Sequence, residues 1–346
     1  MKRIIALALS LVAVCTLFAS CKKEKTGGTK DGERKLYNYD LSQYVTLGDY
    51  KGIEVDTSSE TFQNYKESFF KNDVSNANLY IKRTTGKVEK GDLTNFDYNG
   101  KKKSDGTAID SNTTDLVVGS GQFIPGFEDN LIGKNVGDLF EFDITFPENY
   151  GDPDLNGQLA TFTIKINYVS DIPEKNDEFA KKLGYDNLEA YDKALEKQVV
   201  KELVAVELFT GDKCAIKSYP ETEKKRYDDL YDYYINYANE QVKTYTDQGQ
   251  TMDVDTILYT TLGKTADGLK EFYQNTLKRE IITYAIFDAE KLSYTDEAYQ
   301  KELEAQAQAQ GVTVEEFEKQ GDLSYIESTL VLDAVFDYLY TVAKIK

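Results

Sequence analysis

Apolar and polar residues alternate along much of residues 88–171, which is the pattern of β-strands with one buried face. Residues 139–146 alternate most clearly, and residues 161–169 repeat the pattern. The side chains expected on the buried faces are Phe140, Phe142, Ile144 and Phe146, followed by Phe162, Ile164, Ile166 and Tyr168. Glycine-containing turn signals at residues 99–100 and 105–106 separate further strands upstream. The pattern therefore predicts an antiparallel sheet.

A glycine-rich turn at residues 119–121 precedes a short segment with helical spacing. Pro125 suits the first position of a helix, where its missing N–H removes no hydrogen bond. Phe127 and Leu131 are separated by one helical turn, so they share a helix face. Gly133 suits the position just past a helix end. We therefore expect one short helix in the concave face of the sheet.

Apolar residues recur at helical spacing on both sides of this region. Residues 37–87 contain two short strand-like runs and a predicted helix that Thr57 or Ser58 caps and that runs to about Asn72. After a break at Pro173, residues 172–346 are predicted to be almost entirely helical. The helices expected there span 188–209, a segment from Pro220 onward, 253–262, 266–292, 296–310, 313–320 and 324–345.

The first residues, 1–20, predict an export signal. Basic Lys2 and Arg3 precede an apolar run that is shorter than the about 20 residues of a membrane span. Small residues lead to Cys21, a pattern that resembles a bacterial lipobox, in which Cys21 carries lipid and anchors the protein at the extracytoplasmic face of a bacterial membrane. The alternative is an ordinary signal peptide with an incidental cysteine. The polar residues 21–36 predict a flexible tether.

Charge and composition restrict the chemistry. The chain has 41 Lys and Arg against 60 Asp and Glu, a net charge of −19, which argues against nucleic acid because such binding neutralises phosphates with basic side chains. Histidine is absent from the sequence, which makes most acid–base and triad chemistries awkward. Cys214 has no cysteine partner once Cys15 leaves with the signal and Cys21 is lipidated. The four aspartates that could suggest calcium lack the spacing of a calcium loop; they are Asp97, Asp105, Asp110 and Asp115. We expect neither a metal nor a cofactor.

Several short motifs occur in order at residues 91–92, 97–100, 105–110, 119–129 and 145–150. Together they resemble the FK506-binding (FKBP) type of prolyl isomerase, and most closely the variety carried by trigger factor. The resemblance implies an α+β fold, in which an FKBP-like antiparallel half-barrel sheet wraps on a short helix. Residues 88–171 would be this isomerase domain, inserted into an all-α domain that resembles the trigger factor C-terminal chaperone domain and is formed by residues 37–87 and 172–346. The ribosome-docking domain of trigger factor has no counterpart in the sequence, so no ribosome partner is expected.

The resemblance also implies a site for a prolyl ring. Phe127 would form its floor, and Asp110 would place a carboxylate near the carbonyl of the twisting amide. The backbone N–H of Ile124 and the hydroxyl of Tyr150 would bind substrate carbonyls. The walls would be Tyr98, Ile109, Phe123, Ile124 and Phe162. Thr114 stands where the family has another pocket aromatic, which opens one wall.

These residues also have plainer interpretations. Buried phenylalanines such as Phe127 and Phe162 are most often core residues, and Asp110 alone is compatible with a turn or a helix cap. A tyrosine-rich face after Pro220 is expected to pack against other helices rather than to bind client chains, although tyrosine also suits half-solvated contacts. The members of this face are Tyr227, Leu230, Tyr231, Tyr234 and Tyr237.

Rotation about an X–Pro amide has a barrier of about 18–20 kcal/mol and limits folding in many proteins. Lowering it requires an apolar pocket that removes water and favours the twisted amide, with no nucleophile, metal or cofactor. The resemblance implies a peptidyl-prolyl cis–trans isomerase and chaperone that binds unfolded or proline-containing polypeptides and assists the folding of exported proteins. Two alternatives are a non-catalytic holdase with the same fold and a lipoprotein that captures peptides or another envelope ligand.

Overall fold

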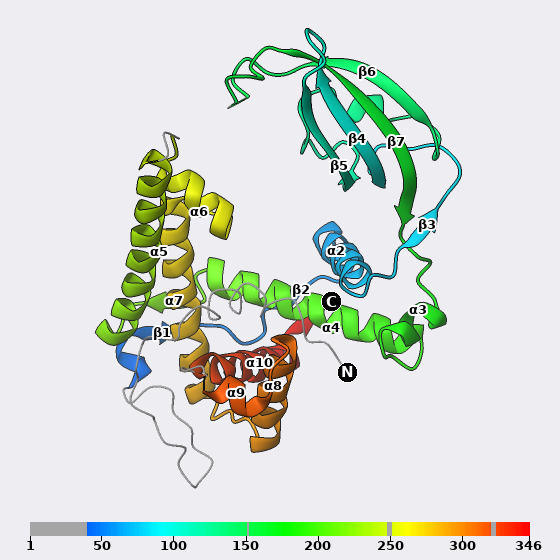
Figure 1. Cartoon of the computed structure of the whole chain (residues 1–346). Coiled ribbons are helices and arrows are strands. Elements are labelled where there is room, and N and C mark those ends of the chain that lie inside the picture. The colour runs from blue at the N-terminus through cyan, green and yellow to red at the C-terminus, as the bar shows by residue number, and fades with distance from the viewer. Residues whose placement is uncertain (1–39, 151, 248–250, 320–322) are drawn as a thin grey trace. The chain divides into compact units, whose positions relative to one another are not determined.

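The computed structural model describes residues 40–150, 152–247, 251–319 and 323–346 (Figure 1). The chain divides into two compact units. The first contains the described residues up to Tyr65 together with Glu196–Lys346, and the second is Lys66–Leu195. The predicted signal peptide, the lipidation site at Cys21 and the tether lie outside the described residues.

The second unit contains a five-stranded antiparallel sheet, which we call the sheet domain (residues 81–171). Its strands are β3 (Ile81–Arg83), β4 (Leu93–Lys102), β5 (Ala108–Val117), β6 (Leu139–Thr145) and β7 (Leu159–Asp171). β4 lies along one edge of β7 and carries β5 on its far side. β6 and β3 follow one another along the other edge of β7. The predicted antiparallel sheet is confirmed.

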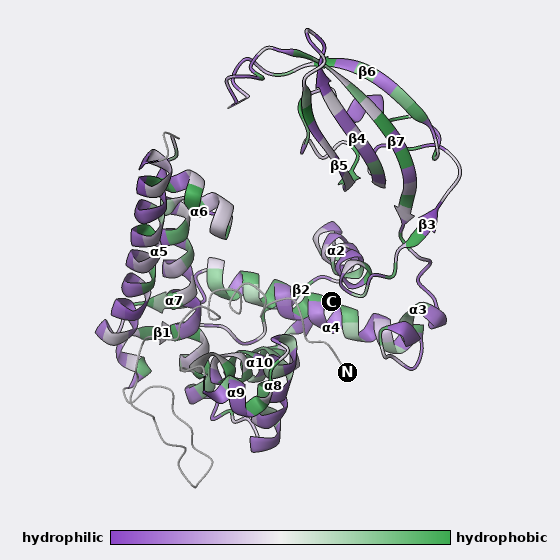
Figure 2. Ribbon diagram, in the orientation of Figure 1, coloured by the Kyte–Doolittle hydropathy of each residue, from purple (hydrophilic) through white to green (hydrophobic). Residues whose placement is uncertain are grey.

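Hydrophobic and hydrophilic residues alternate in bands along β7 (Figure 2). The buried members are Phe162, Ile164 and Ile166. A β-bulge at Asn167 then inserts one extra residue, because Phe96 pairs with Ile166 and Asn95 pairs with Tyr168. Val169 is buried as a result, and the prediction that Tyr168 shares the buried face is wrong. Tyr168 is half-buried, with the Lys82 ammonium 4.1 Å from its ring centre.

The short helix expected around Phe127 is confirmed as a 3₁₀ helix, η2 (Glu128–Asn130), but it does not begin at Pro125. Gly126 has a φ of +89°, which a right-handed helix starting at Pro125 cannot include. Phe127 and Leu131 nevertheless both point into the core of the sheet domain, and each is 0 % exposed.

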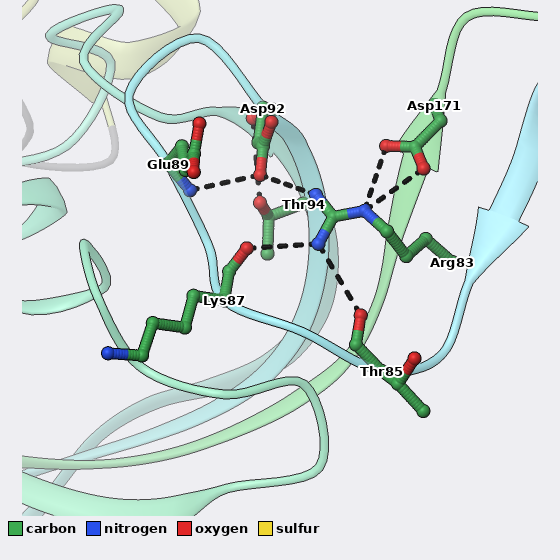
Figure 3. Close-up of polar contacts among 7 residues, drawn as sticks. All are labelled: Arg83, Thr85, Lys87, Glu89, Asp92, Thr94 and Asp171. Carbon is green, nitrogen blue, oxygen red and sulfur yellow. Dashed lines mark hydrogen bonds and ion pairs between the residues drawn. The ribbon is translucent and has the colours of Figure 1, made fainter.

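Arg83 joins the strands at which the chain enters and leaves the sheet domain (Figure 3). Its Nε donates to both carboxylate oxygens of Asp171, at 3.1 and 3.0 Å. Its Nη2 donates to Asp92 at 2.8 Å, and its Nη1 donates to the carbonyl of Lys87 at 2.9 Å. Asp92 also accepts the backbone N–H of Glu89 at 2.9 Å. The guanidinium therefore links the first and last strands of the domain and the start of β4.

Helices make up most of the remaining described chain. They are α2 (Glu60–Asn76), α3 (Asp177–Lys182), α4 (Leu188–Thr210), α5 (Glu221–Asp247), α6 (Val254–Leu262), α7 (Ala266–Ala289), α8 (Asp296–Ala309), α9 (Val314–Glu318) and α10 (Ser324–Val342). The predicted helices are confirmed from α4 onward, within a few residues at their ends. The predicted cap of α2 is wrong: the hydroxyl of Ser59, and not that of Thr57 or Ser58, accepts the N–H of Phe62 at 3.2 Å. No helix in the described ranges has the length and apolar character needed to cross a membrane.

Short strands connect distant parts of the described chain within the first unit. β1 (Val45–Leu47) pairs antiparallel with β8 (Cys214–Ile216), and β2 (Glu54–Val55) pairs parallel with β9 (Lys344–Ile345). The two strand-like runs are confirmed, but each pairs with a distant partner. The last helix ends before its predicted limit because the following residues form β9. The fold is α+β, and the sheet domain is inserted among helical regions.

Glu290, just past α7, reinforces this connection. Its carboxylate accepts the hydroxyl of Tyr50, accepts the hydroxyl of Tyr338 in α10 at 2.5 Å, and lies 2.8 Å from the ammonium of Lys51. These hydrogen bonds, chiefly the one from Lys51, lower the pKa of Glu290 to about 2. One ionised side chain thus holds the segment after β1, the end of α7 and α10 together.

The tyrosine-rich face of α5 is partly buried. Tyr227 and Tyr234 are buried, and the Tyr227 hydroxyl donates to Glu280 of α7 at 2.8 Å. Tyr237 is 37 % exposed and Tyr233 is 49 % exposed. The predicted packing role is confirmed for Tyr227 and Tyr234, while other tyrosines of the helix stay in contact with solvent.

Candidate functional site

Aromatic rings surround Phe127 inside the sheet domain. Phe123 stacks on it, with ring centres 4.4 Å apart and planes inclined by 25°. Phe142 and Phe162 each approach edge-on with ring centres 5.2 Å away, and Phe96 lies at 6.1 Å. Offset-stacked and edge-on geometries are the favourable ones for aromatic pairs. We call this group of five rings the aromatic cluster.

Two local features of β4 and β5 shape this face of the sheet. A Cβ atom added to Gly100 would lie 2.6 Å from Cε1 of Phe162, so only glycine lets that ring rest against the strand. The register of β4 and β5 shifts between Gly100 and Lys101, which leaves Ile109 as an extra residue beside Asp110. Ile109 packs against the core of the sheet domain, and Asp110 lies opposite Gly100.

Tyr98 and Asp110 form a hydrogen-bonded pair at the rim of the cluster. The Tyr98 hydroxyl donates to Oδ2 of Asp110 at 2.6 Å, and Oδ1 accepts the backbone N–H of Ser111 at 2.7 Å. The hydrogen bond to Asp110, aided by burial and by nearby Tyr150, raises the pKa of Tyr98 to about 12. The Tyr98 ring also meets Phe123 edge-on at 5.7 Å. The phenol therefore stays protonated at neutral pH and orients an exposed carboxylate.

The structure brings most of the predicted site residues together. Those within or against the core of the sheet domain are Tyr98, Ile109, Phe123, Ile124, Phe127 and Phe162, with Asp110 held at the rim by Tyr98. Tyr150 is 46 % exposed, and its ring packs edge-on against Phe146 at 4.7 Å. Thr114 is half-buried on β5, opposite Phe96.

Glu128 organises the loop that carries Phe123, a role that the sequence patterns did not indicate. Its Oε2 accepts the backbone N–H groups of Gly119 at 2.6 Å and Gly121 at 3.1 Å, and its Oε1 accepts that of Phe123 at 3.1 Å. Burial alone would raise the pKa of this carboxyl, but the backbone donors outweigh burial and the pKa is lowered. A carboxylate shortly after a glycine-rich turn, whose N–H groups need an acceptor, is the signal that identifies such a residue.

Comparison with known proteins identifies the family. Residues 84–169 match the FKBP-type peptidyl-prolyl cis-trans isomerase family, and residues 235–341 match the C-terminus of the bacterial trigger factor protein. The trigger factor of Oceanobacillus iheyensis is 31% identical over 324 residues, which cover 87% of this chain and 73% of that protein. The trigger factor of Staphylococcus carnosus is 30% identical over 318 residues, covering 87% of this chain and 71% of its own. The chain belongs to the trigger factor family.

Membership of the trigger factor family supports the interpretation of this protein as a folding chaperone that carries a prolyl isomerase domain. The FKBP-type match falls on the sheet domain, and the trigger factor C-terminal match begins within α5 and ends within α10. A solved trigger factor chain is 19% identical and covers 86% of this chain, but its TM-score of 0.30 is too low for the two folds to be compared. In the described part of this trigger factor homologue, no group of three or more His, Cys, Asp or Glu residues could hold a metal ion.

Proposed function

We propose that this trigger factor homologue catalyses peptidyl-prolyl cis–trans isomerisation in the aromatic cluster and assists the folding of exported proteins. The observation that carries the proposal is the juxtaposition of Phe127, buried among aromatic rings, with the Tyr98–Asp110 pair at the rim. An apolar floor beside an oriented carboxylate suits an X–Pro bond, which has a flat hydrophobic ring on one side and a polar amide on the other.

The chemistry requires no bond to the protein. Twisting the amide breaks its resonance, which is the source of the barrier of about 18–20 kcal/mol. Rings such as Phe127 and Phe162 would hold the prolyl ring and exclude water from the amide. Each 1.4 kcal/mol by which the site favours the twisted amide over the planar forms increases the rate roughly tenfold.

The polar groups would act on the carbonyls. Asp110 would face the carbonyl of the twisting amide, and Tyr98 keeps that carboxylate in one orientation through its 2.6 Å hydrogen bond. The backbone N–H of Ile124 and the hydroxyl of Tyr150 would bind neighbouring substrate carbonyls. Tyr150 is 46 % exposed, so it would make contact with the substrate chain outside the cluster.

The proposed location depends on the first residues of the sequence. Lys2, Arg3 and the apolar run before Cys21 support export and lipid attachment. We therefore propose that Cys21 carries a lipid anchor at the extracytoplasmic face of a bacterial membrane and that the clients are exported polypeptides.

A Cys21→Ser variant tests the anchor. The wild type should sediment with membranes and carry the added mass of acyl chains at its N-terminus, and the variant should lose both properties. An identical distribution of the two proteins and an unmodified N-terminus would contradict the anchor.

A non-catalytic holdase is the second candidate. Exposed tyrosines on the helices favour it, because Tyr259 is 66 % exposed on α6 and Tyr233 is 49 % exposed on α5. Tyrosine combines apolar area with a hydrogen-bonding group, which suits contacts with unfolded chains. The half-buried Thr114 also supports this candidate, because a polar side chain there leaves one wall of the prolyl site open.

Two measurements on the same proteins distinguish the candidates. One is the refolding rate of a protein limited by a prolyl step, and the other is the suppression of aggregation of a reduced, unfolded protein. The variant combines Phe127→Leu with Asp110→Asn, since Leu keeps most of the buried volume. The control is Asp129→Asn, an exposed carboxylate of the same domain.

An isomerase predicts faster refolding with the wild type and the control, and at least tenfold less acceleration with the double variant. A holdase predicts no acceleration by any protein, together with aggregation suppression that survives the double substitution. Acceleration undiminished in the double variant would reject the proposed site.

A further inference from the structure

We infer that the ring of Phe123 covers the surface of Phe127 that a prolyl ring needs, so that Phe123 acts as a gate of the site. The inference rests on the proposed isomerase function and concerns how substrates gain access to the site. It assigns to Phe123 a role opposite to that of a wall, because a gate hinders binding until it moves.

Phe127 has no exposed surface, at 0 %, although it is the residue proposed to contact the substrate. Of the rings that enclose it, Phe96, Phe142 and Phe162 lie on strands of the sheet. Phe123 is the exception, because it lies in the loop between β5 and η2; like Phe142, it is half-buried.

The stacking geometry places Phe123 over the face of Phe127 and not at its edge. Ring centres 4.4 Å apart with planes inclined by 25° leave no room for a third ring between them. A prolyl ring that packs on Phe127 from the loop side must therefore take the volume that Phe123 fills. Phe142 and Phe162 approach the same ring at 74° and 83°, as side walls do.

The backbone beneath Phe123 is fixed, so the gate is a side chain and not a loop. The N–H of Phe123 is bonded to Glu128 at 3.1 Å, and the same carboxylate holds Gly119 and Gly121. Opening consequently requires rotation about the two side-chain torsions of Phe123. The rotation gives up the stack on Phe127 and the edge contact with Tyr98 at 5.7 Å.

A gate of this kind weakens apparent affinity without changing the chemistry. The apparent dissociation constant equals the intrinsic one divided by the fraction of molecules with the gate open. Each aromatic contact given up on opening corresponds to an affinity loss of about two- to tenfold, so the stack and the edge contact together correspond to about 5- to 100-fold. Removing the Phe123 ring should therefore lower the apparent dissociation constant by that factor.

The test compares Phe123→Val with Phe140→Val in otherwise full-length protein. Phe140 is also half-buried in the sheet domain, and it stacks on Phe142 with ring centres 6.2 Å apart and lies outside the proposed site. NMR exchange spectroscopy on a short Phe–Pro peptide yields KM and kcat, and calorimetry yields the peptide Kd. Phe123→Leu, which retains more volume, serves if the valine variant fails to fold.

The gate predicts that Phe123→Val lowers both KM and Kd by about 5- to 100-fold, with kcat within about twofold of the wild type and the control unchanged. A raised KM, or a kcat that falls tenfold, would show that Phe123 is a wall of the site. If no protein accelerates exchange, the isomerase function fails while the Kd comparison still decides the gate. Peptide binding by Phe123→Val that is equal to that of the wild type, weaker or absent overturns the gate.

Discussion

Replacing Glu128 by Gln keeps the size of the side chain and removes its charge. The Glu128 carboxylate accepts the N–H groups of Gly119, Gly121 and Phe123 at 2.6, 3.1 and 3.1 Å. An amide has only one oxygen, so its NH₂ group must face at least one of these donors. Hydrogen bonds to charged groups contribute about 1.5–3 kcal/mol and neutral ones about 1 kcal/mol. We expect Glu128→Gln to destabilise the sheet domain by about 2–4 kcal/mol.

The pH dependence of stability provides a second reading of the same contacts. Burial raises the pKa of Glu128, but the backbone donors prevail and lower it below its ordinary value. A depressed folded-state pKa stabilises the fold at pH values above the unfolded-state pKa of about 4.3, and this contribution is lost as the pH falls through the folded-state pKa. The wild type should lose stability over this acidic range, and Glu128→Gln should lose less.

Denaturant unfolding and the catalysed exchange of a Phe–Pro peptide measure both consequences. The loop carries Ile124, whose backbone N–H is proposed to bind a substrate carbonyl, so KM should rise in the variant as the loop loosens. Glu141→Gln is the control, because Glu141 is an exposed carboxylate that accepts one hydroxyl, that of Thr163 at 2.8 Å. Glu128→Gln with wild-type stability and wild-type KM would refute the assigned role.

Three further substitutions test other contacts. Tyr98→Phe removes the hydroxyl that orients Asp110 and should lower kcat/KM about two- to tenfold. Because the pKa of Tyr98 is raised to about 12, the stability that this pair gives the wild type is full below about pH 10. This stability should fall as the pH rises towards 12, which urea unfolding would show. Glu290→Gln should destabilise the helical unit by about 2 kcal/mol. Because the pKa of Glu290 is lowered to about 2, the difference in melting temperature between the wild type and this variant should vanish as the pH falls from about 4.3 towards 2. Arg83→Met should lower the melting temperature of the sheet domain by several degrees through loss of the paired bonds to Asp171, and an unchanged value would refute that link.

The helices could be predicted from the sequence because their spacing and their caps agree. Asp253 accepts the N–H of Thr256 at 2.7 Å at the start of α6, and Thr265 accepts that of Gly268 at 3.2 Å at the start of α7. Thr313 forms a capping box at the start of α9. Such signals lie within a few residues of the helix they begin, so the sequence reveals them directly.

The features that could not be predicted depend on distant partners or on single bonds. The pairing of β1 with β8 and of β2 with β9 joins strands of two or three residues across long separations in sequence. The bulge at Asn167, which exchanges Tyr168 for Val169, reflects the register with β4. The aromatic residues of the candidate site could be found from motif order, but the stack of Phe123 on Phe127 is a rotamer choice that motifs do not encode.

The most direct test of the central claim is the cis–trans exchange rate of a short Phe–Pro peptide, measured by NMR with catalytic amounts of the protein starting after Cys21. The account predicts accelerated exchange by the wild type, reduced at least tenfold when Phe127→Leu and Asp110→Asn are combined in a protein with unchanged circular dichroism. Exchange at the uncatalysed rate with the wild type, or undiminished acceleration with the double variant, would contradict a prolyl site in the aromatic cluster.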